Sequence, residues 1–150
     1  MDLLLMRHGD ALFGYPDKTR VLSPKGQAEV KSVVQQIIAA GIDIQKIYHS
    51  GFKRTMQTAS LIADDFKKAA NDSWDLITPD QNPEPIIESL SLWDKNTIIV
   101  THMPLIQSLL DEIPADNHPE SSVSFDTAMT CHLKGQGNQW HIEGFFKPQL

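Results

Sequence analysis

Blocks of apolar and polar residues follow one another along the chain in patterns that fit strands and helices in turn. Residues 2–6 are a short apolar run and residues 97–101 are β-branched throughout, which is typical of strands covered on both faces, and residues 44–49 predict a second short strand. Residues 30–38 and 56–66 instead carry apolar side chains at intervals of three and four, which predicts one-sided helices. This alternation predicts a three-layer α/β/α sandwich around a mainly parallel sheet.

Turn and cap residues set limits to these elements. Ser23 followed by Pro24 fits a helix N-cap and first helical position, and Gly41 is a suitable end for the same helix. The second helix is expected from residue 52 to about residue 69. Residues 72–85 are rich in Asp, Asn and Pro and predict a loop, broken by an edge strand at its one apolar pair, Leu-Ile.

The second half of the chain is expected to hold shorter elements. A Lys-Gly-Gln-Gly-Asn segment between two apolar runs is typical of a hairpin turn. Two short helices are predicted, one over residues 86–93 and one from Pro104 onward. A C-terminal antiparallel hairpin is predicted from residues 123–133 and 140–146.

Length and composition fit one globular domain. The chain has 150 residues, of which 41% are apolar and 21% charged, and it contains no repeat or linker. The net charge of −6 disfavours nucleic acid as a partner. A single cysteine, Cys131, excludes an internal disulfide, and no apolar segment is long enough for a signal peptide or a membrane span. We therefore expect a cytoplasmic protein with no membrane partner, acting as a monomer.

The basic residues are unevenly distributed. Residues 1–54 hold 8 Lys/Arg and 5 Asp/Glu, whereas residues 55–150 hold 5 and 14. All three arginines, Arg7, Arg20 and Arg54, fall in the basic part. The planar guanidinium suits the two-pronged binding of carboxylate or phosphate oxygens, so these arginines are candidate anion ligands.

Three polar clusters follow predicted strands directly. They are Arg-His-Gly at residues 7–9, the segment from Ser50 to Arg54, and Thr-His at residues 101–102. Because parallel strands end at the same edge of a sheet, which is where α/β proteins bind ligands, we expect these clusters to share one site. That site would hold two imidazoles and two guanidiniums.

This set of side chains suits phosphoryl transfer to histidine. Two arginines and a protonated imidazole neutralise a phosphate dianion without a metal. The nucleophile has to be a neutral imidazole, and neighbouring cations favour that form for His8. A backbone carbonyl that accepts from its other ring nitrogen would fix the tautomer, and Gly9 allows close approach of substrate. The other four histidines lack metal-ligand spacing, so we expect neither a metal nor a cofactor.

These clusters resemble the signature segments of the histidine phosphatase superfamily, also called phosphoglycerate mutase-like proteins. Residues 5–10 read Leu-Met-Arg-His-Gly-Asp, and residues 50–59 are similar to the family's Ser-Pro-x-x-Arg-x-x-Gln-Thr-Ala. Residues 100–105 are similar to its Ser/Thr-His-x-Pro segment. Gly51 departs from the family's usual proline but removes no functional group.

The resemblance implies that His8 attacks phosphorus and becomes phosphohistidine, and that Arg7, Arg54 and His102 bind the phosphate. Arg20 resembles a further substrate-side arginine of the small SixA-type phosphohistidine phosphatases.

The general acid is harder to assign from the sequence. Asp80 is the first candidate because it lies in the loop where smaller members of the family carry an acidic residue, and Glu84 is the second. Both also fit solvated loop charges.

The spacing of the segments narrows the substrate class. Arg54 and His102 are 48 positions apart, which leaves little chain for the helical cap of many family members. We expect one histidine phosphatase domain over residues 1–150, with an open pocket suited to a phosphohistidine on another protein, such as a phosphorelay histidine domain or a phosphocarrier. The alternatives are a small-molecule phosphomonoesterase of the same family and a non-catalytic module that binds phosphohistidine.

Overall fold

A computed structural model describes all 150 residues and contains one seven-stranded sheet in the order β3-β2-β4-β1-β6-β7-β5. The strands are β1 (Asp2–Arg7), β2 (Lys46–His49), β3 (Ala70–Ser73), β4 (Thr97–Thr101), β5 (Ala115–Asp116), β6 (Thr130–Gln136) and β7 (Gln139–Phe146). The helices are α1 (Pro24–Ala39), α2 (Lys53–Asp65), α3 (Pro83–Leu90) and α4 (Leu105–Glu112), with short 3-10 turns η1 (Asp17–Thr19) and η2 (Asp75–Ile77). None of the helices is both long and apolar enough to cross a bilayer.

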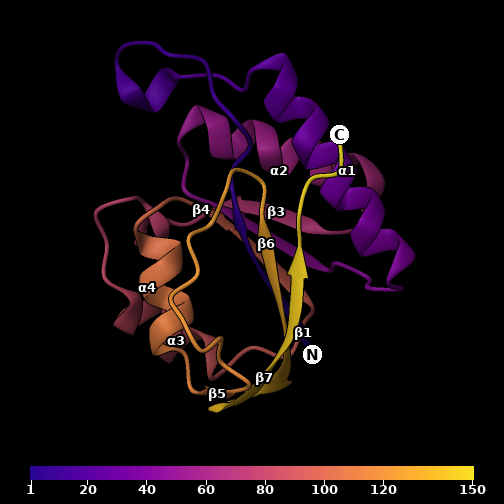
Figure 1. Ribbon diagram of the computed structural model, residues 1–150, viewed down its shortest axis with the longest axis vertical. Coiled ribbons are helices and arrows are strands. Elements are labelled where there is room, and N and C mark those ends of the chain that lie inside the picture. The colour runs from indigo at the N-terminus through magenta and orange to yellow at the C-terminus, as the bar shows by residue number, and fades with distance from the viewer.

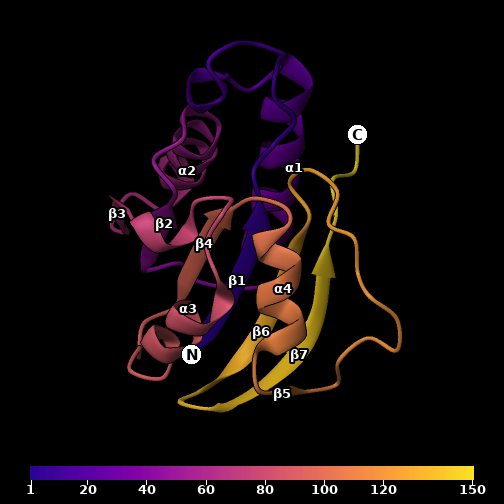
Figure 2. The same ribbon diagram turned by 90° about the vertical axis from the view of Figure 1, so that its left-hand side faces the viewer.

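The sheet is the middle layer of three (Figures 1 and 2). Strands β1 to β4 run parallel, while β6 and β7 form the antiparallel hairpin that continues the sheet beyond β1. Helices α1 and α2 cover one face, and α3 and α4 cover the other. Along β1, Leu3 and Leu5 join the core under α3 and α4, whereas Leu4 and Met6 join the core under α1 and α2. The predicted α/β/α fold and its C-terminal hairpin are therefore confirmed.

The start of α1 is fixed as the sequence predicts. The Ser23 hydroxyl accepts a hydrogen bond from the Gly26 backbone N–H at 2.9 Å, and Pro24 occupies the first turn. Gly41 follows the helix with φ of 76°.

Two glycines let the loop after β1 lie directly against α1. A Cβ at Gly26 would lie 2.0 Å from the Asp10 carbonyl oxygen, and a Cβ at Gly9 would lie 2.7 Å from the Gly26 carbonyl oxygen. Ser23 strengthens the same contact, because its hydroxyl donates to the Asp10 carboxylate at 2.6 Å. The backbone around His8 is therefore held against the helix.

The segment between α2 and α3 differs from the prediction. Helix α2 ends at Asp65 and not near residue 69, and after a turn over residues 66–69 the chain forms the edge strand β3 (Ala70–Ser73). The strand predicted at residues 76–77 is the 3-10 turn η2. β3 is polar and exposed and is held by backbone pairing with β2, so no apolar pattern marks it. The apolar side chain of Ile77 is explained by its burial in the core and not by a strand. The Ile77 carbonyl accepts a hydrogen bond from the Thr101 hydroxyl.

The hairpin also begins later than predicted. β6 starts at Thr130, and the preceding residues 123–129 form a loop that lies against the end of β1. The Arg7 guanidinium Nη1 donates to the Phe125 carbonyl at 2.7 Å, and the Arg7 backbone N–H donates to the Met129 carbonyl at 3.1 Å. This loop therefore orients Arg7.

The contact at Gly26 generates a stability prediction. Replacing Gly26 by Ala forces a methyl group against the Asp10 backbone, which should lower the free energy of unfolding by about 2 kcal/mol. Equilibrium urea unfolding measures this loss. Gly14→Ala is the control, because its Cβ would make an ordinary contact 3.6 Å from Arg20 Cγ and should change stability by less than about 0.5 kcal/mol. Equal effects of the two substitutions would contradict the role given to Gly26.

Candidate active site

The three polar clusters meet at the carboxyl edge of the parallel strands. β1 and β4 pair in register with Arg7 opposite Thr101, so His8 and His102 follow side by side and their ring centroids lie 5.2 Å apart. Arg54 comes from the first turn of α2. The cavity between them has a volume of about 240 Å³ and is lined by Arg7, His8, Asp10, Ala11, Asp17, Arg20, Arg54, Pro79, His102, Met103 and Thr127.

Hydrogen bonds on both sides of the His8 ring define its tautomer. Nδ1 lies 2.7 Å from the Gly9 carbonyl oxygen, which can only accept, so Nδ1 carries the hydrogen. Arg54 Nε can only donate, and it lies 3.2 Å from His8 Nε2, which therefore has a free electron pair. The ring is buried at 7% exposure. His8 thus presents an unprotonated Nε2 as a nucleophile.

Both imidazoles of the cavity are neutral at pH 7. Burial lowers the pKa of His8 to about 4, and the Arg54, Arg7 and Arg20 cations act in the same direction against the bond to Gly9, which raises it. Burial likewise lowers the pKa of His102 to about 3, with further lowering from His8 and Arg54. The protonated imidazole expected from the sequence is therefore absent from the free protein, because two buried rings share the cavity with cations.

Two buried nitrogen atoms at the cavity have no hydrogen-bond partner. They are Arg7 Nε and His102 Nδ1. The other nitrogen of His102, Nε2, lies 2.7 Å from the Ser50 hydroxyl, which fixes the ring. A buried polar atom without a partner costs about 1–3 kcal/mol, so the free cavity is incomplete. Both residues line the cavity.

Asp17, which the sequence reasoning missed, connects two of the arginines. Its carboxylate accepts from Arg54 Nη2 and from Arg20 Nη1, both at 3.2 Å, and its backbone carbonyl accepts from Arg54 Nη1 at 2.9 Å. Burial would raise the pKa of Asp17, but the hydrogen bonds from Arg20 and Arg54 outweigh it and the pKa is lowered. The Asp17 carboxylate therefore accepts from N–H groups of Arg54 and Arg20 that would otherwise be available to an anion in the cavity. The feature of the sequence that could have indicated this role is the position of Asp17 three residues before Arg20, which allows the two side chains to pair.

The two carboxylates proposed as the general acid lie outside the residues that line the cavity. Asp80 is exposed, and its carboxylate accepts from the Thr78 hydroxyl of its own turn at 2.9 Å. Glu84 is exposed in the first turn of α3. The residue of this loop that lines the cavity is Pro79. The lining carboxylates are Asp17 and Asp10, and Asp10 accepts from the Ser23 hydroxyl.

Glu29 of α1 lies behind the loops that form the site, and the sequence reasoning did not identify it either. Its carboxylate is buried, accepts from the Asp10 backbone N–H at 2.9 Å, and accepts from the Thr127 hydroxyl at 2.9 Å. It thereby ties α1 to loops on both sides of the cavity. Its sequence signal is a carboxylate directly before Val30 on the apolar face of a helix.

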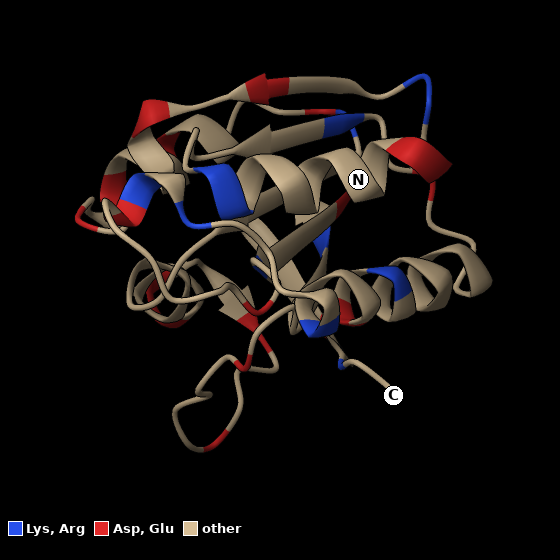
Figure 3. Ribbon diagram, turned by 90° about the horizontal axis from the view of Figure 1, so that it is seen from above, with Lys and Arg blue, Asp and Glu red and all other residues tan.

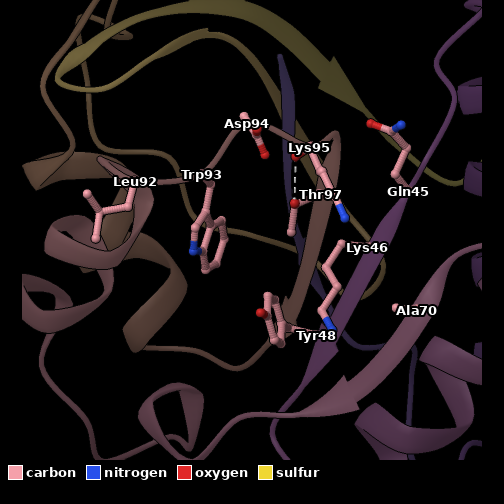
Figure 4. A pocket seen from close by; sticks show the side chains of 9 residues that line it. All are labelled: Gln45, Lys46, Tyr48, Ala70, Leu92, Trp93, Asp94, Lys95 and Thr97. Atoms are coloured by element: carbon pink, nitrogen blue, oxygen red, sulfur yellow. Dashed lines mark hydrogen bonds between the residues drawn. The ribbon is translucent and has the colours of Figure 1, made fainter.

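A second cavity, of about 310 Å³, lies at the opposite edge of the sheet (Figure 4). It is lined by the first residues of β2, β3 and β4 and by Tyr48 and Trp93, whose ring centroids lie 5.2 Å apart. No histidine or arginine lines it. Of these two cavities, the one around His8 is therefore the one with histidine and arginine side chains. Nowhere do three His, Cys, Asp or Glu side chains gather closely enough to hold a metal ion.

Fold and site together define an α/β protein that gathers two histidines and three arginines in one cavity at the edge of a parallel sheet. Residues 3–77, half of the chain, match the model of the histidine phosphatase superfamily, branch 1, and the chain belongs to this superfamily. It is accordingly a phosphatase.

Named relatives cover nearly the whole chain. The phosphohistidine phosphatase SixA homolog of Haemophilus influenzae is 25% identical, over 95% of this chain and 93% of the relative. The phosphohistidine phosphatase SixA of Escherichia coli K12 is 23% identical, with the same coverage. The solved structure of the protein histidine phosphatase SixA complexed with tungstate has a TM-score of 0.87 at 21% identity, covering 99% of this chain and 97% of that one. This last likeness shows a shared fold.

The low pKa of His8 generates a prediction for the pH dependence of stability. The pKa is about 4 in the folded protein and 6.5 for the free side chain, so the unfolded state binds more protons between these values. The free energy of unfolding should therefore fall as the pH is lowered from 6.5 to 4. His8 should contribute on the order of 3 kcal/mol to this fall, and His8→Asn should remove that contribution. Urea unfolding at pH 7.5 and 4.5 measures both proteins, and identical pH dependence would contradict the buried neutral ring.

Proposed function

We propose that this chain removes phosphate from phosphohistidine on another protein through a covalent intermediate on His8. The observation that carries the proposal is the unprotonated Nε2 of His8, which accepts from Arg54 Nε in a cavity also lined by Arg7 and His102, each with one unpartnered buried nitrogen. The names of both curated relatives, which are phosphohistidine phosphatases, support the same substrate class.

In the first step, the hydrogen bond from Arg54 Nε to His8 Nε2 breaks, and the electron pair of Nε2 forms a bond to phosphorus. The bond between phosphorus and the substrate imidazole breaks, and its electron pair returns to that ring nitrogen. Arg7 and Arg54 neutralise the phosphoryl oxygens, His102 Nδ1 donates to one of them, and Arg20 adds a further positive charge beside Asp17. The Gly9 carbonyl keeps His8 Nδ1 protonated while Nε2 reacts.

In the second step, water attacks phosphorus and the bond to His8 Nε2 breaks. The electron pair returns to His8, and inorganic phosphate leaves. A phosphohistidine substrate is suited to a cavity without a free carboxylic acid. Its imidazole, once protonated, is a better leaving group than an alkoxide, so the reaction needs less help from a general acid. Asp80 and Glu84, outside the lining, are then not needed.

The short connection between α2 and β4 supports a protein substrate. Only β3, η2 and α3 lie between them, and α3 has 8 residues. We propose that residues 1–150 form one histidine phosphatase domain without a cap, acting as a monomer. The cavity is then open to a histidine on the surface of a phosphorelay domain or a phosphocarrier protein. A cytoplasmic location fits the single, buried Cys131.

A phosphate-trapping experiment tests the proposal. A phosphocarrier protein labelled with radioactive phosphate on histidine is mixed with the wild type and with His8→Ala and quenched within milliseconds. The wild type should show an acid-labile, alkali-stable adduct and release phosphate, and the variant should show neither, because it lacks the nucleophile. Label on the variant would contradict the mechanism.

Competing substrates separate the alternatives. Release from the phosphoprotein that is faster than from sugar phosphates supports the proposal, and the reverse order would indicate a small-molecule phosphomonoesterase. Tight binding of the phosphoprotein without turnover would indicate a binding module.

A further inference from the structure

We propose that the loop of residues 11–20, between β1 and α1, is the docking surface for the phosphorylated protein, with Phe13 and Tyr15 as its main contacts. This inference rests on the proposed function and names the part of the phosphatase that recognises the protein around the phosphohistidine.

The two aromatic side chains of this loop take no part in the fold. Phe13 is 99% exposed and Tyr15 is 96% exposed, and Leu12 beside them is 48% exposed. Each aromatic ring can bury about 150–250 Å² when covered, and Phe and Tyr are enriched where proteins contact each other. Both rings are therefore available to a partner at no cost to the core.

The loop is held firmly against the active site. The Leu12 N–H donates to the Val21 carbonyl at 2.9 Å, and Arg20 Nε donates to the Leu12 carbonyl at 2.9 Å. Further along the loop, Arg54 of the cavity donates to Asp17. Such a preformed surface loses little conformational entropy on binding. Figure 2 shows the loop as the arch at the top of the molecule, above the carboxyl edge of β1 and β4.

The charges around the cavity indicate the chemistry of the partner. Lys18 on the loop and Lys53 at the start of α2 are exposed. An adjoining cavity of about 500 Å³ shares Arg7 with the active site and is lined by Lys25 and Lys147 and by the carboxylates of Glu29 and Asp126. Figure 3 shows basic residues at the starts of both α1 and α2, although the chain carries a net charge of −6.

These features fit a protein whose phosphohistidine is flanked by apolar and acidic side chains. Opposite charges would guide the partner to the site, and the two aromatic rings would supply contact area. A second copy of this chain offers no phosphoryl group to the cavity and is the less suitable occupant.

The test separates recognition of the protein from the chemistry. The double variant Phe13→Ser/Tyr15→Ser is assayed on a phosphocarrier protein phosphorylated on histidine and on free phosphohistidine. We expect KM for the phosphoprotein to rise about tenfold or more with kcat unchanged, and no change on free phosphohistidine. Leu92→Ser is the matched control, because Leu92 is 86% exposed and lines the cavity at the opposite edge of the sheet. This substitution should change neither KM nor kcat for either substrate.

Three results would overturn the docking surface. They are an unchanged KM for the phosphoprotein, an equal loss on both substrates, and a wild-type dimer in size-exclusion chromatography that the double variant dissociates. If the wild type itself fails to dephosphorylate the phosphoprotein, the proposed function fails, and this outcome is recognised before any variant is compared.

Discussion

The hydrogen bonds on the two ring nitrogens of His8 are the interaction on which the site depends. The Gly9 carbonyl holds the proton on Nδ1, and Arg54 Nε holds the electron pair of Nε2 in the cavity. Each partner is positioned by the fold: Gly9 by its contact with Gly26 of α1, and Arg54 by the first turn of α2. The parallel register of β1 and β4 then brings His102 beside the same ring. A loss of any of these contacts would alter the nucleophile.

The free cavity carries an electrostatic imbalance that an anion corrects. Burial, reinforced by the nearby guanidiniums, keeps His8 and His102 neutral, and the Asp17 carboxylate compensates part of the positive charge. Arg7 Nε and His102 Nδ1 remain unsatisfied. The unpaired nitrogens thus lower stability at the cavity for which we propose phosphate binding, which is the usual relation between a preorganised site and its scaffold. Because Asp17 belongs to the loop that carries Phe13 and Tyr15, anion binding and partner docking involve the same segment.

The sequence was sufficient for the parts of the site that follow strands. Arg7, His8 and His102 could be placed together because parallel strands end at one edge, and the apolar periods were strong enough to predict the layers. Asp17 and Glu29 could not be found in this way, since neither lies at a strand end and each bonds to a residue distant in sequence, Arg54 and Asp10 respectively. β3 has no apolar pattern because backbone pairing with β2 and the ion pair between Lys46 and Asp72 hold it. Asp80 looked suitable by position, but a local bond to Thr78 keeps its carboxylate on its own turn.

The protonation state of His8 is the most direct test of this account. Nitrogen-15 NMR of the ligand-free protein, with histidine labelled in the ring and His8 assigned by comparison with His8→Asn, reports the tautomer and the pKa together. The account predicts a neutral ring with hydrogen on Nδ1 at pH 7 and a titration midpoint of about 4. A ring that carries its hydrogen on Nε2, or that titrates near 6.5 as a free histidine does, would contradict it.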